Sequence, residues 1–463
     1  MKKALLVVFL DTHFTELRRV AHCLQNSGRY TPEFFFARSY PALIRDMVVC
    51  LEAGYPCYDP YGKPCKVRPQ QDELAGGVDA EVSVSLPRRI WRWLYPWLSN
   101  SLPWAWREYH QLYAKVSRFL QEQQIDLLIL AEENVGYATP IWTQAACAAN
   151  VPVVIVPYTV ADASEPAGAV KDIQVYQFNR WPNQIAGSLY PQWVYEHEGR
   201  KLLRLPAGQA IAMQMMGAAP PQPWIMNSSS ADAIAVESDR MRRHYQRLGL
   251  PEGQLVETGA LYDDVLAEGL QSADERREAL YRELGLPAGR PLLLCALPPN
   301  PYPDQLGGFA SYEDLLRFWV ATLAAQRGWN LVLRLHPRMP RAQFAFLEEI
   351  GGRITEEDTA HLVPLCDLYV ASVSATIRWA IACGKPVVNY DVYRLNYDDY
   401  KGLLGVITVS EKQAFVDIIQ TLTDDPERLA AATAAQEAVR EQWGCLDGQS
   451  RVRLLKLLDG LTG

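Results

Sequence analysis

Short apolar runs alternate with amphipathic stretches along most of the chain. Each apolar run has the length of a buried strand and is followed at once by polar residues. Between the runs, apolar residues recur at helical spacing, as Leu17, Val20 and Leu24 do in 14–27. Strands that alternate with helices predict an α/β fold with parallel sheets and right-handed crossovers. The predicted strands are 4–10, 30–37, 126–130, 152–157, 232–236, 255–258, 291–297, 331–335, 367–371 and 386–390.

Polar residues gather after two of the C-terminal strands. Pro337 stops the strand 331–335, and Gly384 closes the helix that follows the strand 367–371. Ligands of open α/β sheets bind outside the carboxyl ends of strands, and guanidinium groups and hydroxyls at a helix start favour a phosphate or diphosphate. The alternative is a strand-end turn followed by ordinary helix caps. The members of this predicted phosphate cluster are Arg334, His336, Arg338, Ser372, Ser374 and Thr376.

This stretch resembles the C-terminal half of a GT-B glycosyltransferase. The "HPR" after a strand and the "S-x-S-x-x-x-x-x-A-x-x-x-G-K-P-V-V" block that begins at Ser372 carry the resemblance. The similar families are enzymes of bacterial capsule and other surface-polysaccharide synthesis, the UDP-N-acetylglucosamine 2-epimerases and the CDP-glycerol-type polymer transferases. Many of these relatives hold the nucleotide ribose with a glutamate a few residues after the second hydroxyl. Arg378 stands there in this chain, and we expect it to add positive charge to the nucleotide site.

The resemblance implies two Rossmann-like, doubly wound domains that face a cleft. We expect an acceptor-side domain over 1–270, with a Trp/Arg-rich insertion at about 55–113, and a nucleotide-binding domain over 285–440. The remaining residues, 441–463, are expected to form a helix that packs back on the N-terminal domain.

The N-terminal half offers four candidate catalytic residues. His13 follows the strand 4–10, and Glu132 and Glu133 follow the strand 126–130, so each could supply a general base. Asp264 closes a "T-G-x-x-x-x-D" element that faces the cleft in the resembling families, and a carboxylate could also act as nucleophile in a double displacement. For each residue the alternative is a role at the start of a helix, as a cap or as favourable acidic charge.

Five tryptophans interleave with arginines over 86–113. Such a segment can lie at a membrane surface or hold a lipid-linked acceptor. The alternative is a helical subdomain whose tryptophans pack on the main sheet, because Pro96 and Pro103 should break a long amphipathic helix.

Composition narrows the function further. A net charge of -8 argues against a general nucleic-acid binder. The nine cysteines are scattered without a C-x-x-C pair, which favours reduced thiols in a cytoplasmic protein. Any membrane contact is expected to be peripheral, at the inner face. No apolar run reaches the ~18 residues of a membrane span. The opening MKKALLVVFL passes directly into a charged segment without a cleavage site, so we interpret it as a strand rather than a signal peptide.

These features favour a glycosyltransferase that moves a sugar from a UDP-, CMP- or CDP-linked donor to a glycan or lipid-linked acceptor in surface-polysaccharide synthesis. The chain has no convincing D-x-D motif, and enzymes of the resembling group commonly dispense with metal, so no metal or other cofactor is expected. One alternative is a sugar-nucleotide 2-epimerase, against which the long N-terminal half argues. A second alternative is a non-catalytic GT-B-like binding protein, because Arg378 replaces the glutamate that many of the resembling enzymes use to hold the ribose.

Overall fold

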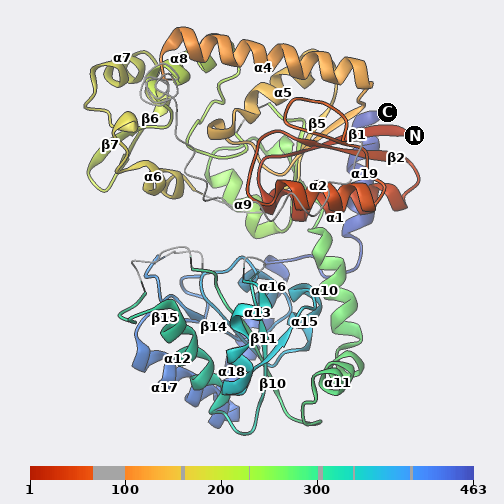
Figure 1. The fold of residues 1–463 in the computed structure, drawn as a ribbon, viewed down its shortest axis with the longest axis vertical. Helices are drawn as coiled ribbons and strands as arrows, with labels where there is room; N and C mark the ends of the chain where they lie inside the picture. The colour runs from red at the N-terminus through yellow and green to blue at the C-terminus, as the bar shows by residue number, and fades with distance from the viewer. Residues whose placement is uncertain (66–99, 158–161, 229, 301–305, 337–338, 397–399) are drawn as a thin grey trace, which may run out of the picture. The chain divides into compact units, whose positions relative to one another are not determined.

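The computed structural model describes residues 1–65, 100–157, 162–228, 230–300, 306–336, 339–396 and 400–463 (Figure 1). These residues form two compact units. Unit 1 consists of Met1–Val236, Arg242–Val256 and Leu454–Gly463, and unit 2 consists of Glu237–Met241 and Glu257–Arg453. Each unit is built on one large sheet flanked by helices, as the alternating apolar pattern predicts.

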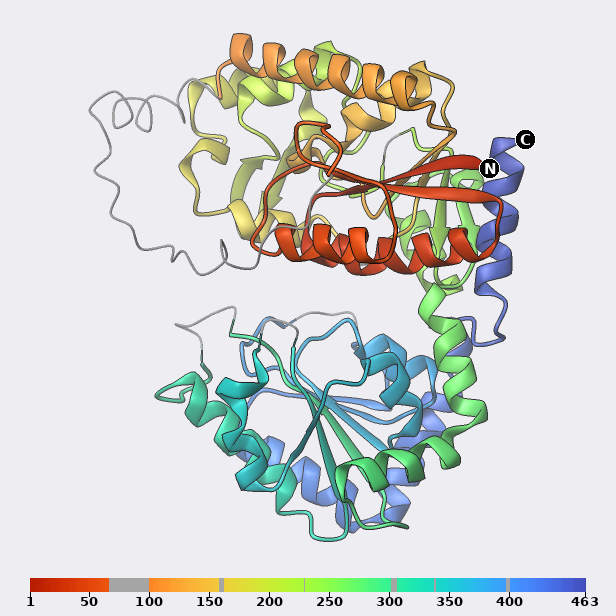
Figure 2. The same ribbon diagram turned by 45° about the vertical axis from the view of Figure 1, so that its right-hand side comes forward.

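The sheet of unit 1 has the strand order β3-β2-β1-β4-β5-β8-β9. Its order therefore reverses between β1 and β4, which pair in parallel. Helices cover both faces, α1 on one and α4 on the other (Figure 2), so the central strands are apolar on both sides. The strands are β1 (Lys2–Val8), β2 (Tyr30–Phe36), β3 (Cys57–Tyr58), β4 (Leu127–Leu130), β5 (Val153–Ile155), β8 (Ala233–Val236) and β9 (Leu255–Glu257).

The stretch 180–223 reads as irregular in the sequence apart from a helix expected at 207–216. That helix is present, and the stretch also contains helix 181–189 and a separate antiparallel hairpin, β6 (Val194–His197) and β7 (Arg200–Leu203). Its elements are short, and they fold around the buried Trp193. Local periodicity does not reveal elements of this kind. The helices of this half of the chain are α1 (Asp11–Asn26), α2 (Leu43–Glu52), α4 (Leu102–Gln123), α5 (Thr139–Ala148), α6 (Ser164–Val170), α7 (Trp181–Leu189), α8 (Ala207–Met215) and α9 (Asp239–Arg247).

Pro103 begins a long helix instead of breaking one. It lies in the first turn of α4, which has 22 residues, where the missing N–H and the fixed φ of proline cost nothing. Ala105, Tyr109 and Val116 are buried on one face of α4, so the part of 86–113 from 102 onward is a packed helix. Trp104 and Trp106 belong to this helix, whereas Trp91, Trp93, Trp97 and Pro96 lie outside the described residues.

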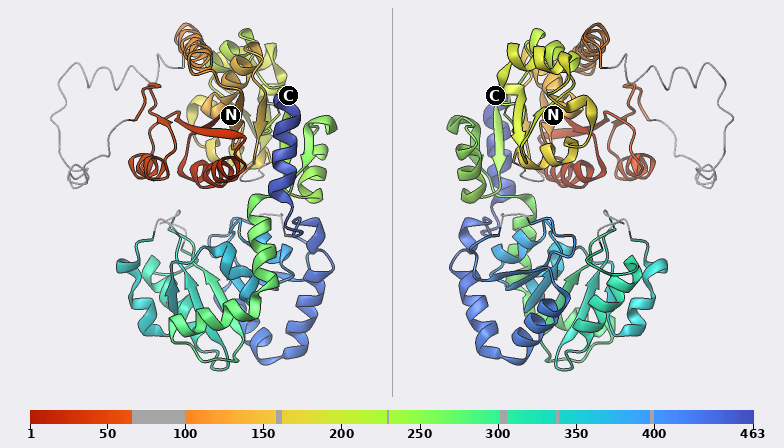
Figure 3. Two further views of the ribbon diagram at one scale, coloured as in Figure 1. Left: turned by 90° about the vertical axis from the view of Figure 1, so that its right-hand side faces the viewer. Right: turned by 90° about the vertical axis from the view of Figure 1, so that its left-hand side faces the viewer.

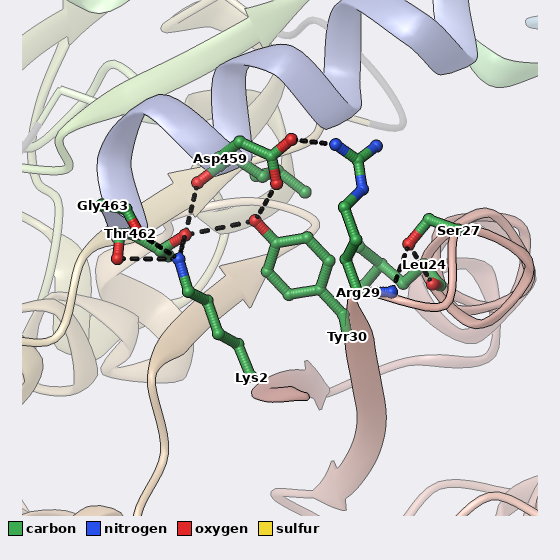
Figure 4. Close-up of polar contacts among 9 residues, drawn as sticks. Lys2, Leu24, Ser27, Arg29, Tyr30, Asp459, Thr462 and Gly463 are labelled. Atoms are coloured by element: carbon green, nitrogen blue, oxygen red, sulfur yellow. Dashed lines mark hydrogen bonds and ion pairs between the residues drawn. The ribbon is translucent and has the colours of Figure 1, made fainter.

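The C-terminal helix packs on unit 1, as the resemblance implies. Helix α19 spans Ser450–Thr462, and its last residues lie beside the first strands of unit 1 (Figure 3). Lys2 Nζ donates to the carbonyl oxygen of Thr462 over 2.9 Å, and the Tyr30 hydroxyl donates to Asp459 Oδ1 over 2.8 Å (Figure 4). Arg29 forms an ion pair with the same carboxylate. These contacts bind the end of the chain to the amino ends of β1 and β2.

The sheet of unit 2 has the order β12-β11-β10-β13-β14-β15, and all neighbouring strands run parallel. Its order reverses between β10 and β13. The strands are β10 (Leu292–Ala296), β11 (Asn330–Arg334), β12 (Arg353–Thr355), β13 (Leu368–Ala371), β14 (Val387–Tyr390) and β15 (Val406–Val409). The helices are α10 (Leu261–Gln271), α11 (Ala273–Leu284), α12 (Tyr312–Ala324), α13 (Arg341–Phe344), α14 (Phe346–Ile350), α15 (Thr359–Leu362), α16 (Ile377–Ala382), α17 (Lys412–Asp424) and α18 (Pro426–Glu437).

The chain passes into unit 2 earlier than the expected boundary at 270. Helix α10 belongs to unit 2 because it buries Tyr262 and Leu266 in the same apolar cluster as the strand residues Leu292 and Tyr369. Trp443 lies in this cluster too, so 441–453 belong to unit 2 rather than to the C-terminal segment.

All nine cysteines are free thiols. Among the helices that the structure describes, none combines the length and the apolar character needed to cross a bilayer.

Candidate functional site

The reversal of strand order in unit 1 brings His13 and Glu132 together. His13 lies in the first turn of α1, directly after β1, and Glu132 follows the carboxyl end of β4. His13 Nε2 lies 3.7 Å from Glu132 Oε1. Because ligands of doubly wound sheets bind where the strand order reverses, this pair occupies the expected position of a ligand site.

The imidazole of His13 is fully buried. The rings of Phe9 and Tyr137 lie against it, with centroids 6.2 and 6.3 Å away. Burial lowers the pKa of His13 to about 4, and the nearby Asp11 carboxylate opposes part of that shift. The ring is therefore neutral at neutral pH and can accept a proton. The Tyr137 side chain that contacts it is half-buried.

Asn134 and Arg204 extend the pair into a polar chain. Asn134 Nδ2 donates to Glu132 Oε1 over 3.4 Å, and Arg204 Nη2 donates to Asn134 Oδ1 over 2.8 Å. Sequence reasoning missed Arg204, which follows strand β7 of the hairpin. The sequence does place a cation within the apolar run "LLRLP". A charged residue is rarely buried without a specific partner, so this position could have indicated a polar site.

Glu133 is separated from Glu132 although the two are adjacent in sequence. Thr143 Oγ1 donates to Glu133 Oε2 over 3.0 Å, and the Glu133 N–H donates to Asn227 Oδ1 over 2.6 Å. Burial raises the pKa of Glu133 to about 8, and the hydrogen bond from Thr143 opposes this shift. Glu133 therefore carries a proton at neutral pH and lies in the interior beside α5.

Asp264 lies in the first turn of α10 and contacts the start of α19. Its Oδ1 accepts from the Ser450 N–H over 2.9 Å, and its Oδ2 accepts from the Arg451 N–H over 3.0 Å. A carboxylate in this position satisfies N–H groups at the start of a helix. The structure thus gives Asp264 a helix-capping contact, but on α19 and not on 265–270. Gly259 approaches Ser450 closely, with φ +74°.

In unit 2, three hydroxyl residues lie between β13 and α16. Ser372 is 7% exposed, and its Oγ forms no hydrogen bond with any described residue. Ser374 Oγ lies 2.8 Å from Thr376 Oγ1, which also contacts the hydroxyl of Tyr369. A buried, unpaired hydroxyl at the reversal between β10 and β13 is a place for a ligand oxygen.

The loop that carries these hydroxyls has an unusual backbone. Val373 has φ +42°, a conformation that strains a β-branched residue. Its N–H donates to Asn389 Oδ1 over 2.8 Å, which holds the loop in place from β14. Sequence reasoning missed Asn389; a polar residue inside the apolar strand "VVNY" was the signal.

Arg334 and His336, like Ser372, lie at the carboxyl ends of strands, but their strand is not next to the strand that Ser372 follows. They end β11, and β10 lies between β11 and β13. Arg334 Nη1 donates to the Leu335 carbonyl over 3.2 Å, whereas its buried Nε has no hydrogen-bond partner among the described residues. The His336 carbonyl accepts from the Met339 N–H over 2.8 Å. Arg338 lies outside the described residues.

Arg378 contributes its charge to an ion pair. Its Nη1 pairs with Glu237 Oε1, and the Tyr262 hydroxyl donates to the other oxygen of the same carboxylate. Both charged side chains are largely buried, at 14% and 8% exposed. The added positive charge that the sequence predicts for the nucleotide site is therefore compensated by Glu237, a residue that sequence reasoning missed.

A cavity of about 800 Å³ opens at the carboxyl ends of β14 and β15. It is lined by residues 306–308, 392–394 and 411–413. Lys412 Nζ donates to the Gly308 carbonyl over 3.0 Å, so the loop after β10 is joined to the start of α17. The cavity lies at the same edge of the sheet as Ser372 and is large enough for a nucleoside.

Comparison with known proteins identifies the fold. No family model matches the sequence, and no curated protein matches it. A solved UDP-GlcNAc 2-epimerase from Neisseria meningitidis, bound to UDP-GlcNAc, matches with a TM-score of 0.52 and 12% identity, over 99% of this chain and 100% of that chain. A putative UDP-N-acetylglucosamine 2-epimerase from Listeria monocytogenes matches with a TM-score of 0.51 and 10% identity, over 99% and 96%.

A variant of the wall teichoic acid polymerase TagF soaked with CDPG also matches, with a TM-score of 0.51 and 10% identity, over 100% of this chain and 88% of that chain. Together with the two doubly wound sheets and the returning C-terminal helix, these similarities show that the chain has the GT-B fold. The resemblance carried by the "HPR" and "S-x-S" motifs is confirmed at the level of fold.

Proposed function

We propose that the protein is a glycosyltransferase that moves a sugar from a UDP-, CMP- or CDP-linked donor to a hydroxyl of a glycan or lipid-linked acceptor. The observation that carries the proposal is the pairing of a neutral His13 with Glu132, 3.7 Å apart, at the strand reversal of unit 1. A neutral imidazole beside a carboxylate is an arrangement suited to removing a proton from a hydroxyl.

His13 is the proposed base, and Glu132 stabilises the imidazolium that forms. The acceptor oxygen bonds to the anomeric carbon while the bond from that carbon to the nucleotide phosphate breaks. The acceptor proton passes to His13, and the electron pair of the broken bond remains on the phosphate oxygen. The His13 ring is fully buried and contacts the Tyr137 ring, and in this proposal acceptor binding displaces Tyr137.

Unit 2 is the proposed donor site. Ser372 Oγ and Arg334 Nε are buried groups without hydrogen-bond partners among the described residues, and both lie at the carboxyl edge of the sheet. With His336 they would stabilise the negative charge that develops on the leaving phosphate. The cavity beside β14 would hold the nucleoside. Transfer without a metal stays a proposal, in which these side chains take the place of a cation.

A sugar-nucleotide 2-epimerase is the second candidate, and the similarity to two solved epimerases favours it. In that reaction a base removes the proton at C2 of the sugar, and the nucleotide leaves by elimination. A binding protein that retains the fold without turnover is the third. The expected link to capsule or other surface-polysaccharide synthesis and a contact between 86–113 and a membrane are part of the first proposal.

The first experiment is a thermal-shift panel with UDP, CMP, CDP and GDP. A nucleotide that binds the folded protein raises its Tm. Arg334→Ala should remove this rise. Arg353→Ala is the matched control. Arg353 begins the adjacent parallel strand β12, so it lies at the amino ends of the strands and not at their carboxyl ends. No rise with any of the four nucleotides would contradict both enzyme proposals.

A sugar nucleotide that contains the nucleotide chosen by the panel is then incubated with the protein in D2O, which separates the reactions. A transferase releases the nucleotide and leaves C2 of the sugar unlabelled. An epimerase introduces deuterium at C2. Binding without either change supports the non-catalytic alternative. His13→Gln should keep the thermal shift and lose nucleotide release; full release in this variant would remove His13 from the mechanism.

A further inference from the structure

Arg204 is a buried cation that packs among apolar residues. It is 7% exposed, and its guanidinium lies 5.7 Å from the centroid of the Trp224 ring, itself buried. A guanidinium removed from water is costly unless other groups compensate it. A cation–π contact supplies only part of that compensation. The remainder should come from the polar groups beside it.

Arg204 and the backbone of Gly136 both donate to one amide oxygen. Arg204 Nη2 donates to Asn134 Oδ1 over 2.8 Å, and the Gly136 N–H donates to the same oxygen over 2.9 Å. Arg204 Nε makes no hydrogen bond with a described residue. Two donors on one side of the amide fix its orientation, since an amide presents its oxygen on one side and its NH2 on the other. The NH2 of Asn134 must then face Glu132.

This orientation matters because one carboxylate oxygen is shared. Asn134 Nδ2 lies 3.4 Å from Glu132 Oε1, and the same Oε1 lies 3.7 Å from His13 Nε2. If the amide rotated by half a turn, its oxygen would face the carboxylate and repel it. Glu132 would then turn away from His13, and the imidazole would lose the group that stabilises its charged form.

We propose that Arg204 is a positioning residue that fixes the Asn134 amide and thereby holds Glu132 against His13. This inference rests on the proposed function, in which His13 is the base. It assigns a role to the β6–β7 hairpin, since Arg204 directly follows β7. The hairpin thus completes a site whose other members follow the central strands β1 and β4.

The charges around His13 are consistent with this role. Asp11 lies on the same helix and Glu132 follows β4. Tyr137, whose ring contacts His13, interacts with Glu132 and with Arg38 and Arg204. Burial and Glu132 raise the pKa of Tyr137, whereas Arg38 and Arg204 lower it. Burial lowers the pKa of Arg204, whereas the negative charge of Glu132 raises it, because the two charges attract each other across the amide.

Four variants test the proposal. Asn134→Asp keeps acceptors for Arg204 and Gly136 but replaces the donor to Glu132 with a carboxylate. Arg204→Met removes the donors and the charge while preserving volume. Arg200→Met is the matched control, because Arg200 lies on β7, the strand that Arg204 follows, is 53% exposed and pairs with Asp172 at the surface. Arg204→Lys keeps the charge but lacks the planar fork of donors.

The first measurement is the NMR spectrum of histidine-labelled protein, with the His13 resonance assigned by its loss in His13→Gln. The second is kcat and KM with the donor that the nucleotide panel selects. Asn134→Asp and Arg204→Met should each shift the His13 resonance and lower kcat by on the order of 100-fold. KM should change little, Arg200→Met should match the wild type, and Arg204→Lys should not restore kcat.

An unchanged His13 resonance and kcat in Asn134→Asp, or a full rescue by Arg204→Lys, would overturn the proposal. If Arg204→Met does not fold, the outcome rests on Asn134→Asp, which keeps the buried ion balanced. If the wild type turns over no donor, the transferase proposal fails, but the NMR shifts still decide whether Arg204 controls the His13–Glu132 pair. The two failures are therefore distinguishable.

Discussion

Arg378 of α16 pairs with Glu237, the residue that directly follows β8, and the two side chains are largely buried. The Tyr262 hydroxyl donates to the second oxygen of Glu237, so both carboxylate oxygens have partners. Tyr262 in turn packs on Trp379, with ring centroids 4.8 Å apart. The resemblance implies a glutamate at the position of Arg378 in many related enzymes; the carboxylate beside Arg378 here comes from a different part of the chain.

This ion pair gives a first prediction. Arg378→Met should destabilise the protein by about 3 kcal/mol, because it leaves Glu237 buried without its cation. Glu237→Gln should cost a similar amount for the opposite reason. The double variant should recover most of the loss, since neither charge then remains unpaired. Urea unfolding of the four proteins measures this cycle, and additive losses in the double variant would show that the pair is not coupled.

Asp264 gives a second prediction. Asp264→Ala should lower the free energy of unfolding by about 1–2 kcal/mol, because the N–H groups of Ser450 and Arg451 lose their acceptor. Asp425→Ala is a matched control, since Asp425 accepts from the N–H groups of Glu427 and Arg428 at the start of α18. Both losses should be of similar size. If Asp264 were instead the catalytic base, its variant would lose kcat by orders of magnitude with little loss of stability.

The sequence predicts the central strands of both large sheets because buried strands are apolar on both faces and end at polar residues; the short edge strands β3, β12 and β15 and the hairpin β6–β7 were not predicted. It also identifies His13 and Glu132 separately, since each directly follows such a strand. What it does not give is their pairing, because the order of strands in the sheet is a property of the whole unit. Arg204, Asn389 and Glu237 were missed for the same reason: each acquires its role from a partner distant in sequence.

Two predicted features changed with tertiary context. Pro103 was expected to interrupt a helix, yet it lies in the first turn of α4, which begins directly after the extended Ser101 and where a proline needs no N–H partner. Asp264 fits a cleft motif in sequence, but the start of α19 arrives beside it and occupies both oxygens. Neither outcome can be read from neighbouring residues alone.

Glu133 gives a prediction about pH. Its folded pKa is about 8, against an ordinary value of 4.5. Between these values the unfolded chain is ionised while the folded protein keeps the proton, so stability falls as pH rises from 4.5 to 8. Asp263, whose pKa burial also raises to about 8, adds to this slope. His13 acts in the opposite direction: its pKa of about 4 makes stability fall as pH drops from 6.5 to 4.

Glu133→Gln isolates the contribution of Glu133, because glutamine still offers an oxygen to Thr143 and does not titrate. The variant should lose less Tm than the wild type between pH 5 and pH 8. Asp263→Asn is the companion variant, which should remove a separate part of the same slope. An identical fall of Tm in Glu133→Gln and the wild type would mean that Glu133 is ionised in the folded protein.

The return of α19 to unit 1 gives the last prediction. Leu458 is fully buried and Leu454 is 2% exposed, whereas the ion pair between Arg29 and Asp459 is partly exposed to water. Leu458→Ala should therefore cost about 2–4 kcal/mol through lost burial and the cavity left behind. Asp459→Ala should cost only about 1 kcal/mol, because water replaces much of what an exposed pair provides. Thermal unfolding of both variants compares the contribution of apolar burial with that of the polar contacts. A larger loss in Asp459→Ala would mean that the polar contacts with Arg29 and Tyr30, and not apolar burial, bind the helix to unit 1.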